Sequence, residues 1–388
     1  MEMNKAAIIL PPSAFPLHFT MEVRFPGEIF GTNNRANPKG IHYHQQRKEF
    51  IVSVTNQNTN TFDRTQILNT AKLDGTRAAF APDYTSFRGV ESEIAIVPPS
   101  GPPINAGFVA GEIFVGRGRD GEISRLSAAG MVMADVFTTV PVMNQSLWGA
   151  LCFDTHGSFG GRLIAVTTLG LIFLVNADGT FAMPAPYNDL SGNPPVIRRA
   201  EGAGVAPATF GPHAGHLIIG VEGEAGVGGG DGNADPESGK VYAVSNNPAD
   251  PPVLLADVGF MAESIAFVPP RGGTYAQAEL AFDRDRENRV LIASASQFIG
   301  RVGRLIVASE ITGEFTEVNW DGVQYTQSFI GRAPGPWTSE GFNQQLYWFA
   351  KGINDSLPAV SITAPKHRVY LVAVQAGTNL LHVRRTEP

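Results

Sequence analysis

The sequence has few of the features that mark disulfide-stabilised or nucleic-acid-binding proteins. Of its 388 residues only Cys152 is a cysteine, so no disulfide can form within the chain. Lys and Arg together number 29 against 36 Asp and Glu, which gives a net charge of −7, and no dense basic run occurs. This balance argues against nucleic acid and against anionic membrane surfaces as partners.

Long apolar runs are also missing. The amino terminus, "MEMNKAAIILPPSAFP", has a short apolar run over residues 6–10 followed by two prolines. Such a run is too short for a signal-peptide core or a membrane span. We therefore expect a cytoplasmic protein, and a secreted one is the alternative if an export signal has been removed.

Helical periodicity is nearly absent as well. No stretch shows a sustained apolar pattern at i, i+3, i+4 and i+7, whereas short apolar strands are interleaved with 43 Gly and 28 Pro along the whole chain. This combination indicates many short strands joined by tight turns. The sequence therefore predicts an all-β protein.

One short strand motif occurs six times. Its copies are "KGIHYHQ" at 39, "ESEIAIVPP" at 91, "WGALCFD" at 148, "EGAGVAP" at 201, "ESIAFVPP" at 263 and "EGFNQQL" at 340. Each copy precedes a turn and a second apolar strand, such as "GHLIIGV" at 215. Turns such as "NADG" at 176 tolerate positive φ and are typical of hairpins.

The spacing of these copies predicts the architecture. The strands start near residues 40, 93, 148, 201, 264 and 340, a period slightly above that of four-stranded propeller repeats. We expect a single domain over residues 1–388, a six-bladed β-propeller with four-stranded antiparallel blades around a central channel. "LHFTMEVRF" at 17 is expected to complete the last blade together with "HRVYLVAV" at 367. A pair of β-sandwiches is the alternative.

Carboxylates gather at the start of the repeated strand. Innermost strands line the channel of a propeller, so residues that begin them should meet at one mouth. The carboxylates in this position are Glu91, Glu93, Glu201, Glu263 and Glu340. Like charges around one axis repel each other, and a divalent cation would compensate for them. Oxygen ligands favour calcium, with magnesium as an alternative. The competing interpretation is that these glutamates are solvated residues at strand starts.

Histidines on the first repeated strand are candidates for catalysis. His42 and His44 lie on this predicted inner strand, and imidazole titrates close to neutral pH, as a general base requires. Imidazole ligands would also shift the metal preference from calcium toward zinc.

Aromatic residues before the last copy predict a pocket for a small organic molecule. The connection over residues 319–340 is expected to be a long loop on the glutamate face. Loops of this length in a compact domain are usually functional, and aromatic side chains above a polar floor suit a small organic ligand. The candidate substrate-binding residues are Trp148, Trp320, Tyr325, Phe329, Trp337, Arg117 and Arg301. The arginines could hold a carboxylate. Packing of the rings onto the propeller is the alternative.

The glutamate-glycine pairs in "AEGAGVAP" and "TSEGFNQQ" carry a family resemblance. With six predicted blades, the chain resembles the propellers of the gluconolactonase, paraoxonase and strictosidine synthase group, and more loosely those built of NHL repeats. In the gluconolactonase branch an E-G-P sequence opens a blade and its glutamate is an axial metal ligand. The resemblance implies that Glu201 or Glu340 corresponds to that ligand.

Two functions follow from the sequence. The first is a metal-dependent enzyme that acts on a small organic molecule at the channel mouth, as a hydrolase of a lactone or ester or as a lyase or isomerase. The second is a non-catalytic ligand-binding propeller, either lectin-like or a protein-interaction module. No G-x-S-x-G elbow, H-E-x-x-H motif or cysteine-pair zinc pattern occurs, so nucleophilic serine catalysis and a structural zinc site are not expected.

Overall fold

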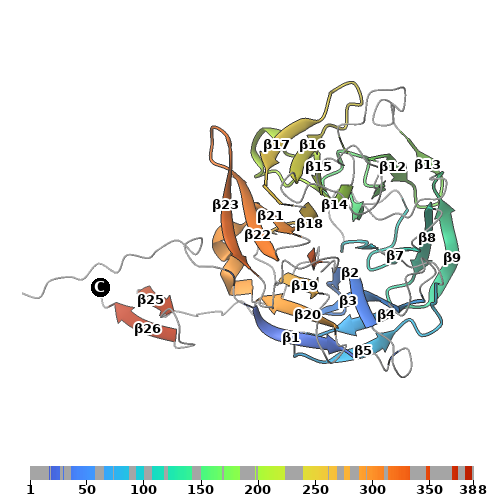
Figure 1. Ribbon diagram of the computed structural model, residues 1–388, viewed down its shortest axis with the longest axis horizontal. Coiled ribbons are helices and arrows are strands. Elements are labelled where there is room, and N and C mark those ends of the chain that lie inside the picture. Colours follow the sequence, from blue (N-terminus) through green and yellow to red (C-terminus); the bar gives the residue numbers. More distant parts are fainter. Residues whose placement is uncertain are drawn as a thin grey trace, which may run out of the picture.

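Short apolar strands and glycine-containing turns build antiparallel sheets of four strands each. In the computed structural model these sheets stand around a central channel as a β-propeller (Figure 1). The structure describes residues 17, 19–26, 29, 36–56, 65–72, 74–86, 93–99, 107–117, 121–141, 150–167, 170–183, 197, 200–222, 239–260, 262–268, 275–279, 288–293, 295–309, 313–332, 347–349, 369–374 and 381–386.

Four blades consist of strands that follow one another along the chain, with the first strand innermost. Blade 1 is β2 (Ala36–His44), β3 (Glu49–Asn56), β4 (Gln66–Ala71) and β5 (Arg77–Phe80). Blade 2 is β6 (Ile94–Ile96), β7 (Ile113–Gly116), β8 (Glu122–Leu126) and β9 (Val132–Thr139). Blade 3 is β10 (Ala150–Phe153), β11 (Leu163–Val166), β12 (Ile172–Val175) and β13 (Phe181–Ala182). Blade 4 is β14 (Ala200–Val205), β15 (Leu217–Val221), β16 (Lys240–Val244) and β17 (Val253–Asp257), with the short 3₁₀ helix η4 (Gly211–His213) between its first two strands.

Blade 5 is interrupted. Its inner strand β18 (Ala262–Phe267) pairs with β21 (Leu305–Ser309), which is followed by β22 (Glu314–Trp320) and β23 (Tyr325–Arg332). Between β18 and β21 the chain leaves the blade and forms β19 (Tyr275–Glu279), β20 (Asn288–Ala293) and the 3₁₀ helix η5 (Ala295–Arg301). This excursion explains why the spacing of the repeated motif lengthens after residue 264.

A composite sheet fills the arc between blades 5 and 1. Its strand order is β1 (Phe19–Phe25), β20, β19 and β24 (Tyr347–Phe349), so three separate parts of the chain contribute to it. The structure therefore has five blades of the repeated type, and the predicted number of six is wrong. The segment near residue 340 lies outside the described residues, and only the three-residue β24 follows it within this sheet.

The predicted closure of the ring also needs correction. β1 pairs with β20 rather than with the segment at 367, because the β19–β20 excursion already supplies an edge for it. The strands β25 (Val369–Val374) and β26 (Leu381–Thr386) pair with each other.

Buried apolar clusters hold neighbouring sheets together. One cluster lies at each junction around the ring, and the cluster that joins the composite sheet to blade 1 includes Phe25, Tyr43 and Phe50. The Tyr43 and Phe50 rings meet edge to face, with centroids 5.1 Å apart. Burial of each such side chain contributes about 1.5–3 kcal/mol, so the ring is stabilised sheet against sheet.

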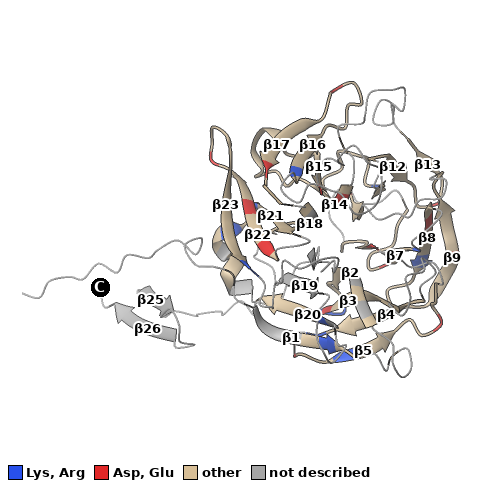
Figure 2. Cartoon of the chain, in the orientation of Figure 1, with Lys and Arg blue, Asp and Glu red and all other residues tan. Residues whose placement is uncertain are grey.

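Charged residues are dispersed over the described strands. Figure 2 shows Lys and Arg interspersed with Asp and Glu around the ring rather than gathered on one blade. Among the described residues, none of the helices has the length and apolar character needed to cross a membrane.

Candidate functional site

A cavity opens where the inner strands of the five blades end. Its volume is about 350 Å³, and its lining comes from the second halves of β2, β6, β10, β14 and β18 and from the turns that follow them. We call this mouth of the channel the histidine end, because His42, His44 and His156 line it. We call the opposite mouth, where the same strands begin, the glutamate end.

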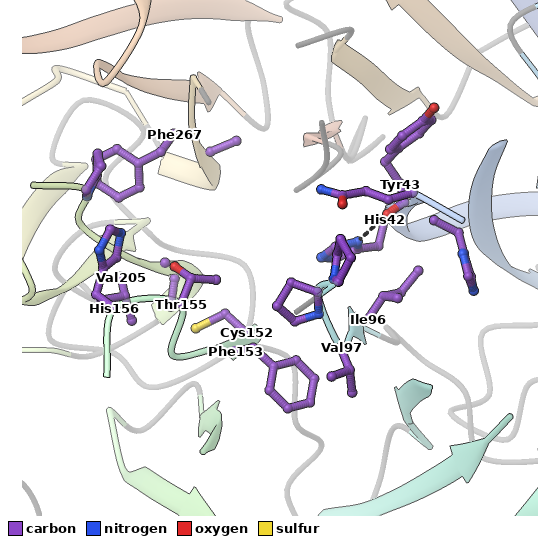
Figure 3. Close-up of a pocket in the computed structure, with 18 of the residues that line it drawn as sticks. His42, Tyr43, Ile96, Val97, Cys152, Phe153, Thr155, His156, Val205 and Phe267 are labelled. Atoms are coloured by element: carbon purple, nitrogen blue, oxygen red, sulfur yellow. Dashed lines mark hydrogen bonds between the residues drawn. The ribbon is translucent and has the colours of Figure 1, made fainter. Parts of the chain in front are cut away.

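The cavity has two walls with a sulfur atom between them. In Figure 3, His42 and Tyr43 lie on one side, and His156, Val205 and Phe267 lie on the other, with Cys152 and Phe153 between them. Cys152, the single cysteine of the chain, is 6% exposed. The arrangement follows from the propeller, since each inner strand brings side chains of one blade to a common axis.

His42 and His44 were predicted as catalytic groups, and both line the cavity. Nδ1 of His42 lies 3.1 Å from the carbonyl oxygen of Tyr43, which makes Nδ1 the protonated nitrogen of the neutral ring. His44 is 1% exposed, and its Nε2 lies 3.1 Å from the carbonyl oxygen of Gly111 on blade 2. Burial lowers the pKa of His44 below its ordinary value, and the positive charge of Arg47 lowers it further. At neutral pH His44 is therefore an uncharged ring that joins two blades.

Asp154 shapes the rim beside His156. Its carboxylate is fully buried and accepts hydrogen bonds from the backbone N–H groups of His156, Gly157, Phe159 and Gly161, at 2.7–3.1 Å. Four such donors stabilise the negative charge and fix the loop that follows β10. Thr155 and His156 are held at the cavity by this loop, and partial burial lowers the pKa of His156.

At the glutamate end, irregular pairing marks two of the predicted metal ligands. Between β14 and β15 the register shifts between Ala200 and Gly202, so Glu201 is the extra residue of a β-bulge. The same shift occurs between Ala262 and Ser264 of β18, which places Glu263 in the equivalent bulge. Bulges re-aim a side chain locally and are common next to functional sites.

Two of these glutamates are buried. Glu93 is 3% and Glu201 4% exposed. Glu91 and Glu340 lie outside the described residues, and so does the side chain of Glu263. Within the part of the chain that the structure describes, no three His, Cys, Asp or Glu side chains come together as metal ligands would. The described residues alone thus do not form a calcium site.

The predicted aromatic loop is largely a hairpin. Residues 314–332 form β22 and β23 with a four-residue turn, so Trp320 and Tyr325 face each other across this turn, with ring centroids 5.1 Å apart. The Tyr325 hydroxyl donates a hydrogen bond to the carbonyl oxygen of Phe210, and its ring stacks on His213. Because β22 runs in the same direction as β18, this turn lies on the side of the histidine end, not of the glutamates.

The remaining aromatic candidates are dispersed. Phe329 on β23 is 61% exposed. Trp148 and Trp337 lie outside the described residues. Phe267 connects the cavity to the hairpin region, because it lines the cavity and packs edge to face on Phe210. It was not predicted, since an aromatic residue inside an apolar strand has no signal that separates it from the core.

Both arginine candidates are held in ion pairs with carboxylates of the protein. Nη1 of Arg301 donates to Oε2 of Glu317 at 2.7 Å, and the Arg301 side chain is 1% exposed. Arg117 pairs with Asp135 at 2.5 Å on the outer strand of blade 2. Neither residue lines the cavity.

Comparison with known proteins does not assign the chain to a family. No protein-family model and no curated sequence matches the chain. Among solved structures it is similar to a β-fructofuranosidase from Schwanniomyces occidentalis in complex with fructosyl-erythritol, at 10% identity and a TM-score of 0.40, over 84% of this chain and 65% of that chain. It thus spans less than two thirds of that enzyme.

Two further structures are similar at the same low level. YCF48 bound to D1 peptide matches at 11% identity and a TM-score of 0.37, over 82% of this chain and 88% of that chain. The WD40 domain of Toxoplasma gondii coronin matches at 8% identity and a TM-score of 0.36, over 82% and 78% of the two chains. No function follows from these likenesses, and the propeller assignment depends on the sheet topology.

Proposed function

We propose that the protein binds a small organic molecule in the cavity at the histidine end. The observation that carries this proposal is the convergence of the five inner strands on one cavity of about 350 Å³, lined mainly by apolar side chains with a few polar groups. Small-molecule sites have this size and composition. This is the binding-module function predicted from the sequence, at a different mouth of the channel.

A fragment-binding experiment tests the proposal. Gly204 lines the cavity, and a Cβ at this position would meet only the Phe267 ring, at ordinary contact distance. Gly204→Leu is therefore expected to fill the cavity without displacing backbone. Saturation-transfer NMR of a fragment library should show fragments that bind the wild type and not Gly204→Leu. In the control Ser328→Leu, the same side chain is added on exposed β23, and binding should persist. Fragment binding identical in all three proteins would refute the proposal.

A second candidate is metal-dependent hydrolysis of a lactone or ester, or a lyase or isomerase reaction, at the glutamate end. The equivalent bulges at Glu201 and Glu263 favour it, together with the burial of Glu93 and Glu201. A bound divalent ion would supply Lewis acidity there, and calcium is the ion that carboxylate oxygens favour. The resemblance to the gluconolactonase group is part of this second proposal.

Elemental analysis tests the metal directly. Protein dialysed against calcium should retain bound ion, melt at lower temperature after chelation, and lose the ion in the double variant Glu201→Gln with Glu263→Gln. A metal-free wild type whose melting is unaffected by chelator would exclude this function. An ion retained by the double variant would mean that other residues bind it.

A further inference from the structure

The cavity at the histidine end has no charged side chain in its described lining. None of the 22 lining residues is Asp, Glu, Lys or Arg. Apolar side chains form most of the surface, and the side chains with oxygen or nitrogen atoms are those of His42, Tyr43, His44, Gln45, Gln46, Thr155 and His156. Since 65 of the 388 residues are charged in the whole chain, an uncharged lining of this size is a specific property of the cavity.

His44 and His156 do not supply the missing charge at neutral pH. Burial lowers the pKa of His44 and of His156, so both rings are neutral in this range. In neutral His44 the proton resides on Nε2, because this nitrogen faces a carbonyl oxygen, which can only accept.

The charged residues that adjoin the lining residues in sequence pair with other groups of the protein. Along the chain, Arg47, Glu112 and Asp154 adjoin lining residues. Arg47 pairs with Glu49 at 2.6 Å, and Arg125 clamps both carboxylate oxygens of Glu112 at 2.8 Å. The Asp154 carboxylate accepts its four backbone N–H groups. Each ion is compensated by protein groups, and none of these side chains lines the cavity.

An ionised ligand would therefore lose its water without gaining a counter-charge. Transfer of an unpaired ion into apolar surroundings is strongly unfavourable, whereas a neutral molecule gains from burial of its apolar surface. We propose that the cavity takes a neutral, largely apolar organic molecule with a hydrogen-bonding group, and discriminates against organic anions and cations. This inference rests on the proposed small-molecule binding and names the ligand class of that site.

Matched probes of one shape test the discrimination. At pH 7.5, 2-naphthol is neutral, 2-naphthoate is an anion and 2-naphthylmethylammonium is a cation. Isothermal titration calorimetry should give a dissociation constant for 2-naphthol at least about tenfold lower than for either ion, and this binding should disappear in Gly204→Leu. If an ion binds as tightly as 2-naphthol, with the same loss in Gly204→Leu, the neutral-ligand inference is wrong while the binding function stands.

A charge added to the cavity provides the converse test. Gln45 lines the cavity from the turn after β2, so Gln45→Lys should strengthen 2-naphthoate binding at least about tenfold and leave 2-naphthol within about twofold. Thr326→Lys on exposed β23 changes the net charge equally and should leave both constants unchanged. Equal strengthening in both variants would show that the net charge of −7, rather than the cavity, excludes the anion, and would overturn the inference.

If none of the three probes binds the wild type, the small-molecule function falls together with its ligand class.

Discussion

At the scale of single residues, His44 links burial to stability. Its ring is 1% exposed, and its hydrogen bond to Gly111 connects the inner strand of blade 1 to blade 2. An unfolded histidine titrates near 6.5, and burial places the pKa of the folded ring below that value. Between the two values the unfolded chain binds more protons, so stability falls as the pH drops through the unfolded pKa.

The prediction concerns His44→Gln, which retains an N–H donor for the Gly111 carbonyl but does not titrate. The melting temperature of the wild type should decrease between pH 7.5 and 5.5, and that of the variant should decrease less. At pH 7.5 the variant should be less stable by roughly 1 kcal/mol, from poorer hydrogen bonding and packing. Circular dichroism melts over this range provide the measurement. An equal decrease in melting temperature for the two proteins would contradict the assignment of this pH dependence to His44.

Residue-scale sequence reasoning placed His42 and His44 on the inner strand of a blade. His42 and His44 line the cavity because their strand is the innermost of its blade. The sequence could not show that Asp154 is buried under four backbone N–H groups, because this depends on how the loop after it folds back. It also could not pair Arg301 of η5 with Glu317 of β22, so Arg301 looked available for a ligand.

At the scale of elements, turns fit tightly between neighbouring blades. Gly170, in the turn between β11 and β12 of blade 3, has φ +78°, and a Cβ there would collide with the backbone carbonyl of Ile197 ahead of blade 4. Gly322, in the β22–β23 turn, has φ +105° and open space around the Cβ position. The two glycines thus separate the effect of positive φ from that of contact between blades.

Alanine substitutions at these glycines should differ in cost. Gly322→Ala is expected to destabilise the protein by about 1 kcal/mol, from backbone strain alone. Gly170→Ala should cost roughly 2–4 kcal/mol, because backbone of two blades must also move. Urea unfolding of both variants measures the difference. Equal losses would indicate that the junction between blades 3 and 4 accommodates the extra methyl group.

Elements were predicted well where they are regular. Within blades 1 to 4 the strand, turn, strand order follows from alternating apolar runs and D-G or G-rich turns. The hairpin β22–β23 was taken for a loop because its turn, residues 321–324, and residues 326–328 of the outer strand β23 are exposed and lack an apolar run. The sequence could not show that the β19–β20 excursion leaves blade 5, because apolar periodicity does not show which sheet a strand joins.

At the scale of the whole molecule, the composite sheet closes the ring. Phe25 on β1 is fully buried in the cluster that also contains Tyr43 and Phe50 of blade 1. Strands from three parts of the chain must meet in this sheet, so its packing connects the amino-terminal strand to both neighbouring blades.

Phe25→Ala should weaken this closure by roughly 3–5 kcal/mol, the usual cost of a buried phenylalanine. Phe329→Ala removes the same side chain from a site that is 61% exposed, and a change within about 0.5 kcal/mol is expected. Chemical denaturation of both variants provides the comparison. If the first variant is as stable as the second, the composite sheet does not hold the ring together.

The sequence by itself determined the all-β class, the four-stranded blades and the inner strands, because these depend on local periodicity and turn chemistry. Only the tertiary structure decided that five such blades form and that a composite sheet fills the remaining arc. It also decided that the histidines and the glutamates occupy opposite ends of the channel. These features depend on contacts between residues far apart in the chain, which local patterns do not encode.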